Sequence, residues 1–293
     1  MGLTGIQSTS LVFGKMKNKL VRIFRTSEVL KNLEKCIVEK LPFSLIRFGD
    51  GGIKLLHALF HNDQEQLASI SFKEGIPLEM MIDVVELWGK YARQADYIDT
   101  PEVYFLDNFW IRYRKGTKKA TKKTVERMGM WRELYHSAEF DNDSYCNPEI
   151  NYIACVNSKK RRNLLSIIEG RKICLITACV NARLKLYKYS VDIVPIVGQY
   201  SKHYEISYEK VVGYIEQNYD KYDLWLVAAG ELGRIYSGMI KEKGGRAFDI
   251  GFVVDFWHNG FVPHRLEMFM RRNPKNFLEL VFTPLGERFD KYL

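Results

Sequence analysis

The sequence has no long uninterrupted hydrophobic run. No apolar segment approaches the ~18 residues that a membrane-spanning helix needs. The N-terminus also lacks the apolar core of a signal peptide, because Lys15, Lys17, Lys19 and Arg22 interrupt its apolar residues. We therefore expect a cytoplasmic protein.

Paired cysteines are missing too. The 5 cysteines are an odd number, and no two of them form a Cys-x-x-Cys pair. Cys174 and Cys179 lie in an apolar stretch, which favours reduced thiols in a core over a disulfide framework. This cysteine usage agrees with a cytoplasmic location.

Motifs for nucleic acid and for the common nucleotide folds are absent as well. The sequence has no zinc-finger spacing, RNP-type aromatic motif, basic zipper, P-loop or fixed-period repeat. The formal net charge of +9, from 44 basic and 35 acidic residues, indicates anionic partners. Phosphates of nucleotides or of lipid headgroups remain candidates, whereas nucleic acid is not expected.

Two basic segments stay open to interpretation. Residues 1–26 are basic and amphipathic, which fits either a solvated segment or a helix on an anionic membrane surface. The second reading would place the protein at the inner face of the membrane as a peripheral protein. The run 114–123 is either a solvated loop or a loop that gathers an anionic substrate.

Strand-like and helix-like segments alternate along the rest of the chain. Short apolar runs predict strands at 43–48, 172–177, 191–197, 224–229 and 246–250. Helical spacing predicts helices at 28–40, 53–60, 76–92, 208–218 and 233–243, with a mainly helical insertion over 60–150 that contains a strand at 103–106. The alternation predicts an α/β fold with a mostly parallel sheet and helices on both faces. Residues 261–293 are expected to form a tail against the domain.

The first candidate site lies where the strand at 43–48 ends. The strand meets the turn Gly49-Asp50-Gly51-Gly52, and a predicted helix follows it. Glycine tolerates positive φ and lets a ligand approach the backbone. The carboxyl ends of strands are the usual ligand sites of open α/β sheets. Arg47 and Asp50 are therefore placed at a binding edge.

Two further glycine turns follow later strands. Gly230 and Gly233 separate a strand from a helix, and helix N-termini after such turns offer N–H groups to phosphates. This turn is not a dinucleotide fingerprint, because it lacks a third glycine. Asp249 and Gly251 end another strand, and Asp255 follows with Trp257 and His258.

Together, these motifs resemble bacterial glycosyltransferases of the GT-D fold. The family pattern at the first site is Arg-[Phe/Tyr]-Gly-Asp-Gly-Glu, and Arg47 to Gly51 match it in order. The second is a Leu-Gly-Pro-Thr-like turn, a helix and Ala-Ile-Asp-Ile-Gly-His, which 229–251 follow in outline. Of a third motif of this family, only the arginine is matched in this sequence, by Arg183. The resemblance spans roughly 40–260 and implies a Rossmann-like GT-D domain over 27–260.

The resemblance implies an activity as well as a fold. It implies transfer of a hexose or deoxyhexose from a nucleotide diphosphate sugar, such as a UDP-sugar, to a glycan or lipid-linked acceptor in bacterial surface polysaccharide or glycoprotein synthesis. Its catalytic candidates are Asp50, Asp255 and Glu231, with His258 as a further candidate base. Its donor-binding candidates are Arg47, Gly49, Gly51, Arg183, Gly230, Asp249 and Gly251.

Two positions depart from the family pattern. Gly52 stands where the family has the Glu of Asp-x-Glu, and Phe252 stands where it has a His. Asp50 alone could hold Mn²⁺ or Mg²⁺, because phosphates and water supply other oxygen ligands. Alternatively, Arg47 and Arg183 neutralise the diphosphate without a metal. A third alternative is a non-catalytic relative that binds a nucleotide sugar or a glycan.

Overall fold

The computed structural model describes residues 22–24, 26–47, 50–99, 144–146, 164–179, 190–198, 200–251 and 253–254. The predicted strand at 103–106, the basic run 114–123 and the tail 261–293 lie outside these residues. In the part that is described, no helix is both long and apolar enough to cross a membrane.

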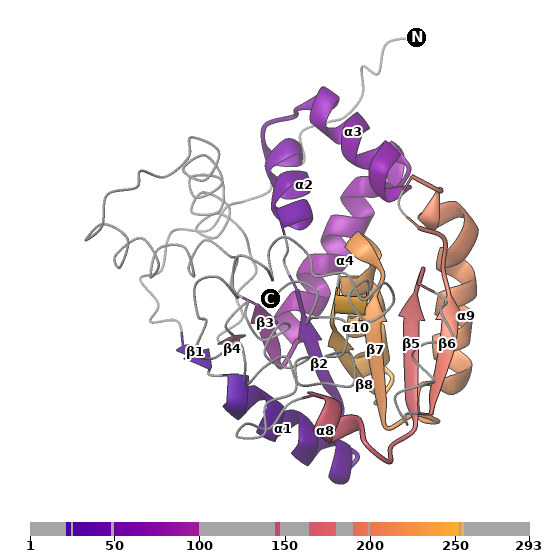
Figure 1. Cartoon of the computed structure of the whole chain (residues 1–293). Helices are drawn as coiled ribbons and strands as arrows, with labels where there is room; N and C mark the ends of the chain where they lie inside the picture. Colours follow the sequence, from indigo (N-terminus) through magenta and orange to yellow (C-terminus); the bar gives the residue numbers. More distant parts are fainter. Residues whose placement is uncertain are drawn as a thin grey trace, which may run out of the picture.

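Eight strands form one sheet, in the order β1-β4-β3-β2-β8-β7-β5-β6. Every pairing between neighbouring strands is parallel. Figure 1 shows these strands side by side. Their bounds are β1 Arg22–Phe24, β2 Phe43–Ile46, β3 Tyr97–Asp99, β4 Ser144–Cys146, β5 Ile173–Thr177, β6 Val191–Pro195, β7 Leu224–Ala228 and β8 Arg246–Asp249. All the carboxyl ends therefore meet at one edge of the sheet.

Helices cover both faces of this sheet, as the alternation of strands and helices predicts. Those described are α1 Thr26–Val38, α2 Asp50–Phe60, α3 Gln64–Glu74, α4 Met81–Gln94, α8 Leu164–Ile168, α9 Glu209–Asn218 and α10 Gly233–Glu242. Short turns of helix precede three of them, namely η1 Leu78–Met80, η3 Tyr204–Tyr208 and η4 Gly230–Leu232. Helices α2 and α3 lie beyond the carboxyl ends of the strands, at the top of Figure 1.

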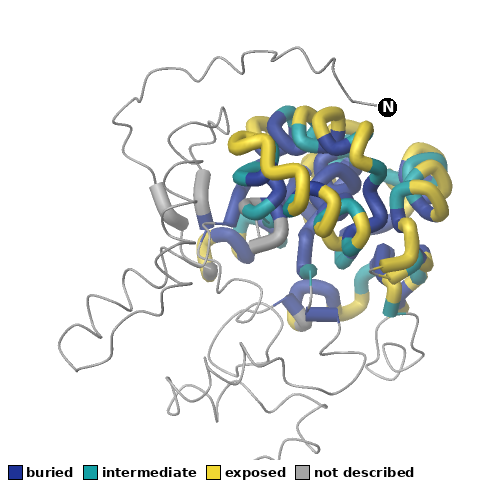
Figure 2. Tube along the Cα trace, turned by 90° about the horizontal axis from the view of Figure 1, so that it is seen from above, coloured by how far each residue is buried: buried dark blue, intermediate teal, exposed yellow. Residues whose placement is uncertain are grey.

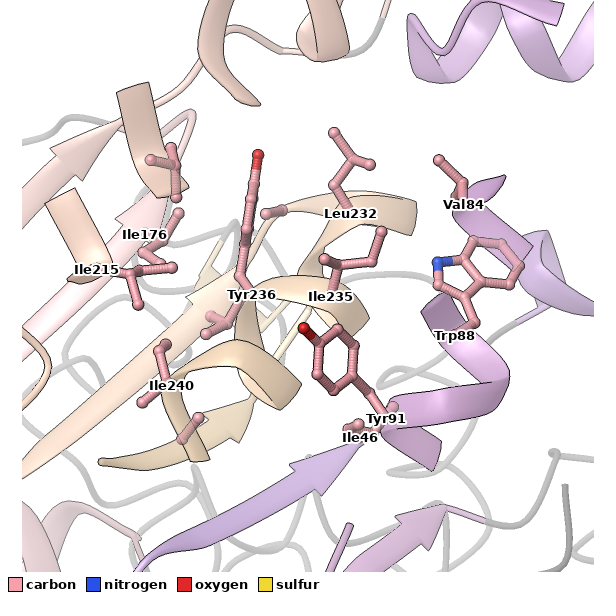
Figure 3. Packing of buried hydrophobic residues seen from close by; sticks show 14 of the residues in the cluster. Ile46, Val84, Trp88, Tyr91, Ile176, Ile215, Leu232, Ile235, Tyr236 and Ile240 are labelled. Atoms are coloured by element: carbon pink, nitrogen blue, oxygen red, sulfur yellow. The ribbon is translucent and has the colours of Figure 1, made fainter. Parts of the chain in front are cut away.

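The core divides into two clusters, one on each face of the sheet. Side chains alternate across a strand, and β7 shows this: Leu226 joins the cluster under α1 and α8, whereas Trp225 joins the cluster under α4, α9 and α10. In the second cluster, Trp88 and Tyr91 of α4 face Ile235 of α10 (Figure 3). Seen from above in Figure 2, buried residues run through the interior and exposed ones lie on the outer turns. The α/β prediction is confirmed.

The end of α1 differs from the predicted helix over 28–40. The helix ends at Val38, and Lys40 adopts a left-handed backbone with φ 54°. The N–H of Leu41 then bonds the carbonyl of Cys36 at 2.9 Å, which closes a Schellman-type cap. Leu41 therefore lies beyond the helix and is 43% exposed.

Two short strands, the edge strand β1 and the inner strand β3, differ from the sequence prediction. Arg22–Phe24 forms β1, which pairs with β4, so neither alternative for residues 1–26, a solvated segment or a helix, holds for these three residues. Tyr97–Asp99 forms β3, directly beside β2, in a region predicted to be helical. Both strands have three residues, a length at which hydrophobic periodicity carries little information. Residues 1–21 lie outside the description.

Candidate active site

The three predicted glycine turns converge at the carboxyl edge of the sheet. Strand β8 lies between β2 and β7, so Arg47, Asp249 and Gly230 lie at the carboxyl ends of three neighbouring strands. The N–H groups of Ile250 and Gly251 bond the carbonyl of Val227 at 2.9 and 3.2 Å, which ties the end of β8 to β7. The chain leaves β2 towards β3 on one side and returns to β8 on the other. Ligands bind at such a switch point in open α/β sheets.

Arg47 lies at the end of β2 with its side chain 13% exposed. Its Nε is 3.5 Å from Oδ2 of Asp99, the buried last residue of β3. Gly251 lies directly against the guanidinium, and a Cβ atom at that position would overlap Nη1 of Arg47. Gly251 also has φ 49°, a conformation that other residues rarely adopt. Two independent requirements therefore explain a glycine there.

Asp249 is buried at the end of β8. Its Oδ1 accepts a hydrogen bond of 3.0 Å from the N–H of Gly251, and the backbone of Arg47 donates another to its carboxylate. Burial raises the pKa of this carboxyl above its ordinary value, whereas the charges of Arg47 and Arg234 act to lower it. The carboxylate of Asp249 thus lies in the field of two guanidinium groups.

Arg234 contacts the first two of these turns, and its charge acts on Asp249 at the third. Its side chain is 4% exposed and forms an ion pair with the carboxylate of Glu231. Its Nε donates a hydrogen bond of 2.6 Å to the carbonyl of Arg47. Its guanidinium carbon lies 4.4 Å from the ring centroid of Trp88, a cation–π distance. Its Nη2 is 2.6 Å from the place that a Cβ atom on Gly52 would take.

Glu231 was a catalytic candidate, and the structure places it in η4 beneath the turn after β7. Its side chain is 8% exposed and pairs with Arg234. Burial raises the pKa of Glu231, the guanidinium of Arg234 opposes this rise, and the carboxylate of Glu74 adds to it. Because its carboxylate is buried against a cation, the geometry favours a structural role. A role as general base stays a prediction.

Gly230 begins η4 with a left-handed backbone, φ 54°. A Cβ atom there would lie 2.9 Å from Oε2 of Glu74, the buried last residue of α3. Lys73 neutralises Glu74 at 2.9 Å. The end of α3 therefore approaches the turn after β7 and helps to enclose the edge of the sheet.

The remaining predicted residues fall partly or wholly outside the described part. Asp50 is the first residue of α2 and Gly51 the second, but neither side chain is described. Gly49, Arg183, Asp255 and His258 lie outside the described residues. Within the described ranges, no group of three His, Cys, Asp or Glu residues could hold a metal ion.

Sequence reasoning missed Asp99, Trp88 and Arg234 as site residues. Asp99 ends a strand too short to be recognised, and Trp88 belongs to an ordinary amphipathic helix. Arg234 follows the second glycine turn directly, but an arginine in the first turn of a helix is usually solvated. The one usable signal is the glycine at 52, whose missing side chain leaves space for a large neighbour.

Comparison with known proteins agrees with this architecture. A family model described as a GT-D fold-like domain matches residues 24–257. A selenomethionine-substituted structure of domain of unknown function 1792 is similar, with a TM-score of 0.54 and 15% identity over 82% of each chain. Another structure of that domain, described as having a distinct glycosyltransferase fold, gives a TM-score of 0.52 and 16% identity over 82% of each chain. No curated protein matches the sequence.

The two solved structures are too distant in sequence to establish more than the shared fold. The family model, however, covers every strand from β2 to β8 and the three turns that meet at their carboxyl ends. The chain therefore belongs to the family of GT-D fold-like domains.

Proposed function

We propose that this protein is a glycosyltransferase that moves a sugar from a nucleotide diphosphate sugar to a glycan or lipid-linked acceptor. The observation that carries the proposal is the cluster of Arg47, Asp99, Asp249 and Arg234 at the carboxyl ends of neighbouring strands. Family membership supplies the reaction class, and the cluster supplies fixed charge at the edge where ligands bind.

The chemistry explains why positive charge at this edge matters. Breaking the bond between sugar and diphosphate develops negative charge on the leaving phosphates. Fixed donors and cations aimed at that charge stabilise the transition state. Arg47 is the partly exposed cation of the cluster. In the proposal Arg47 faces the diphosphate, and Asp99 and Asp249 hold it in place.

Asp50 begins α2 directly after this junction, so the proposal gives it the ribose-phosphate end of the donor or a metal ion there. Gly49, Gly51, Gly230 and Gly251 provide backbone that approaches the donor, and Arg183 adds charge. Transfer with inversion needs a general base near the acceptor hydroxyl. Asp255 takes this role in the proposal, because Glu231 is paired with Arg234.

One observation favours a second candidate, a non-catalytic protein that binds nucleotide sugars. Glu231 is the one catalytic candidate whose side chain lies in the described part, and its carboxylate is engaged in a buried ion pair. A site that had lost its base but kept its cations would bind a donor without turnover.

A thermal-shift panel of nucleotide sugars separates these functions. The protein is melted with UDP-, GDP- and dTDP-sugars, each with Mn²⁺ and with EDTA, because a ligand that binds the native state raises Tm. Hits are then incubated with radiolabelled donor and candidate acceptors. Stabilisation with labelled product supports the glycosyltransferase. Stabilisation without product from any acceptor or water supports the binding protein, and no stabilisation by any nucleotide sugar contradicts both.

A further inference from the structure

The guanidinium of Arg234 is held by contacts with three other residues. It donates to the carbonyl of Arg47, pairs with Glu231 and lies over the ring of Trp88. The indole Nε1 of Trp88 donates a hydrogen bond of 3.0 Å to the carbonyl of Glu231, so the ring itself is fixed. These contacts hold the planar guanidinium in one orientation.

Gly52 closes the remaining side. It lies in the first turn of α2 and is buried, with Nη2, Cζ and Nε of Arg234 at 2.6, 3.0 and 3.5 Å from the place of a Cβ atom. Real Cβ atoms essentially never approach other atoms within 3.0 Å. Any side chain at position 52 would therefore displace the guanidinium from contacts that fix it.

This geometry tests whether residue 52 could help to bind the metal ion that the resemblance implies. Position 52 would supply the second carboxylate ligand, and here that position has neither a carboxylate nor room for one while Arg234 keeps its place. A cation of the chain itself fills the space, and two like charges at short range repel. Residue 52 therefore does not fit a role in metal binding.

We propose that Arg234 is a positioning residue that replaces this metal arrangement. Its guanidinium fixes the carbonyl of Arg47 and the first turn of α2, the backbone at which a nucleoside diphosphate binds. As a result, the diphosphate binds without a divalent ion. The choice of a nucleoside diphosphate as the ligand rests on the proposed function. The positioning role of Arg234 rests only on contacts between residues of this chain.

The charge and the planar shape of the Arg234 guanidinium contribute separately to the positioning of the site. The charge keeps the Glu231 carboxylate neutralised and acts on Asp249. The fork of nitrogen atoms reaches Arg47, Glu231 and the surface of Gly52 at once, which a lysine ammonium cannot do. Arg234→Lys therefore keeps the charge and loses the bracing, whereas Gly52→Ala keeps the arginine and displaces it.

Binding of UDP, GDP and dTDP is measured by calorimetry in EDTA and in Mn²⁺ for the wild-type protein, Arg234→Lys and Gly52→Ala. Gly213→Ala is the matched control, because Gly213 is also helical and a Cβ atom there meets nothing within 4 Å. We expect wild-type affinity for the best diphosphate to differ less than threefold between EDTA and Mn²⁺. We expect both site variants to bind at least tenfold more weakly, and Gly213→Ala to bind as the wild type does.

Hydrogen exchange of the amides of α2 provides a readout that needs no ligand. In Arg234→Lys and Gly52→Ala we expect these amides to exchange at least tenfold faster, while amides of β5 and β7 keep their protection. If the amides of α2 exchange in both variants at the same rate as in the wild type, the positioning role is overturned, whatever the ligand.

The remaining outcomes are distinct. A wild-type affinity that rises tenfold or more with Mn²⁺ overturns the inference and leaves the glycosyltransferase standing. Wild-type affinity in both site variants also overturns it. If no nucleoside diphosphate binds to the wild type, both the metal-free binding and the proposed function are overturned. In that case hydrogen exchange still decides whether Arg234 holds α2 in place.

Discussion

Gly251 and Arg47 are in such close contact that residue 251 has no room for a side chain. A Cβ atom there would overlap Nη1 of Arg47, and the contact is made between the end of β8 and the end of β2. The position of the site arginine therefore depends on a residue far from it in sequence.

Gly251→Ala should displace Arg47 and strain the backbone at φ 49°. We expect a loss of about 1–3 kcal/mol in the free energy of unfolding and at least a tenfold loss of donor binding. Urea unfolding and calorimetry measure the two effects. Gly170→Ala is the control, since Gly170 has φ 71° but nothing within 4 Å of its Cβ position. Equal donor binding in both variants would contradict the contact.

Asp50→Ala tests the residue that begins α2. Under the proposed function, the variant should lose sugar transfer by at least a hundredfold and still fold, because Asp50 is assigned to the donor and not to the core. Product formation and urea unfolding measure these effects. Full transfer activity in a folded variant would remove Asp50 from the site.

The burial of His203 predicts that the stability of the protein depends on pH. It is buried beside Tyr236, with Nε2 3.3 Å from the tyrosine hydroxyl oxygen, and burial lowers its pKa to about 4 from 6.5. Between these values the unfolded chain binds the proton more readily, so stability falls as the pH falls from 6.5 towards 4. The loss attributable to this residue is up to about 3 kcal/mol.

Urea unfolding at pH 7 and pH 4.5 measures this dependence in the wild type and in His203→Gln. The variant should lose less stability on acidification than the wild type does. His61→Gln is the control for the replacement of an exposed histidine. An equal pH dependence in wild type and His203→Gln would show that His203 does not control it.

Gly238 sets the distance between α4 and α10. A Cβ atom there would overlap the ring of Tyr91, and both residues are buried. Gly238→Ala should therefore lower the free energy of unfolding by about 2 kcal/mol or more, since well-packed helices do not absorb extra atoms. Gly213→Ala in α9 should be neutral or slightly stabilising. Chemical denaturation compares the two, and equal stabilities would refute tight packing at Gly238.

Much of the fold followed from the sequence because its central strands are fully buried. Strands β2, β5 and β7 appear in the sequence as short, mainly apolar runs, and β2, β7 and β8 each lead into a glycine turn. Parallel strands bring their carboxyl ends to one edge, so the approach of Arg47 to Asp249 could be inferred from two separate motifs.

The contacts inside the site could not be inferred in the same way. Asp99 ends a three-residue strand, and its ion pair with Arg47 depends on β3 lying beside β2. The burial of Arg234 depends on Trp88, Glu231 and Gly52, which come from three elements. Sequence periodicity reports which face of a helix is apolar, and it does not report which charged residue has a buried partner.

The position of β8 between β2 and β7 has a consequence for biosynthesis. Strand β2 ends at Ile46, but its neighbour β8 begins only at Arg246. A ribosome-bound chain can pair β2 with β3 early, yet it lacks the central strand of the sheet until most of the polypeptide has emerged. Such long-range pairing slows folding and leaves strand edges exposed to aggregation. The nascent protein should therefore depend on chaperones until Asp249 is available to Arg47.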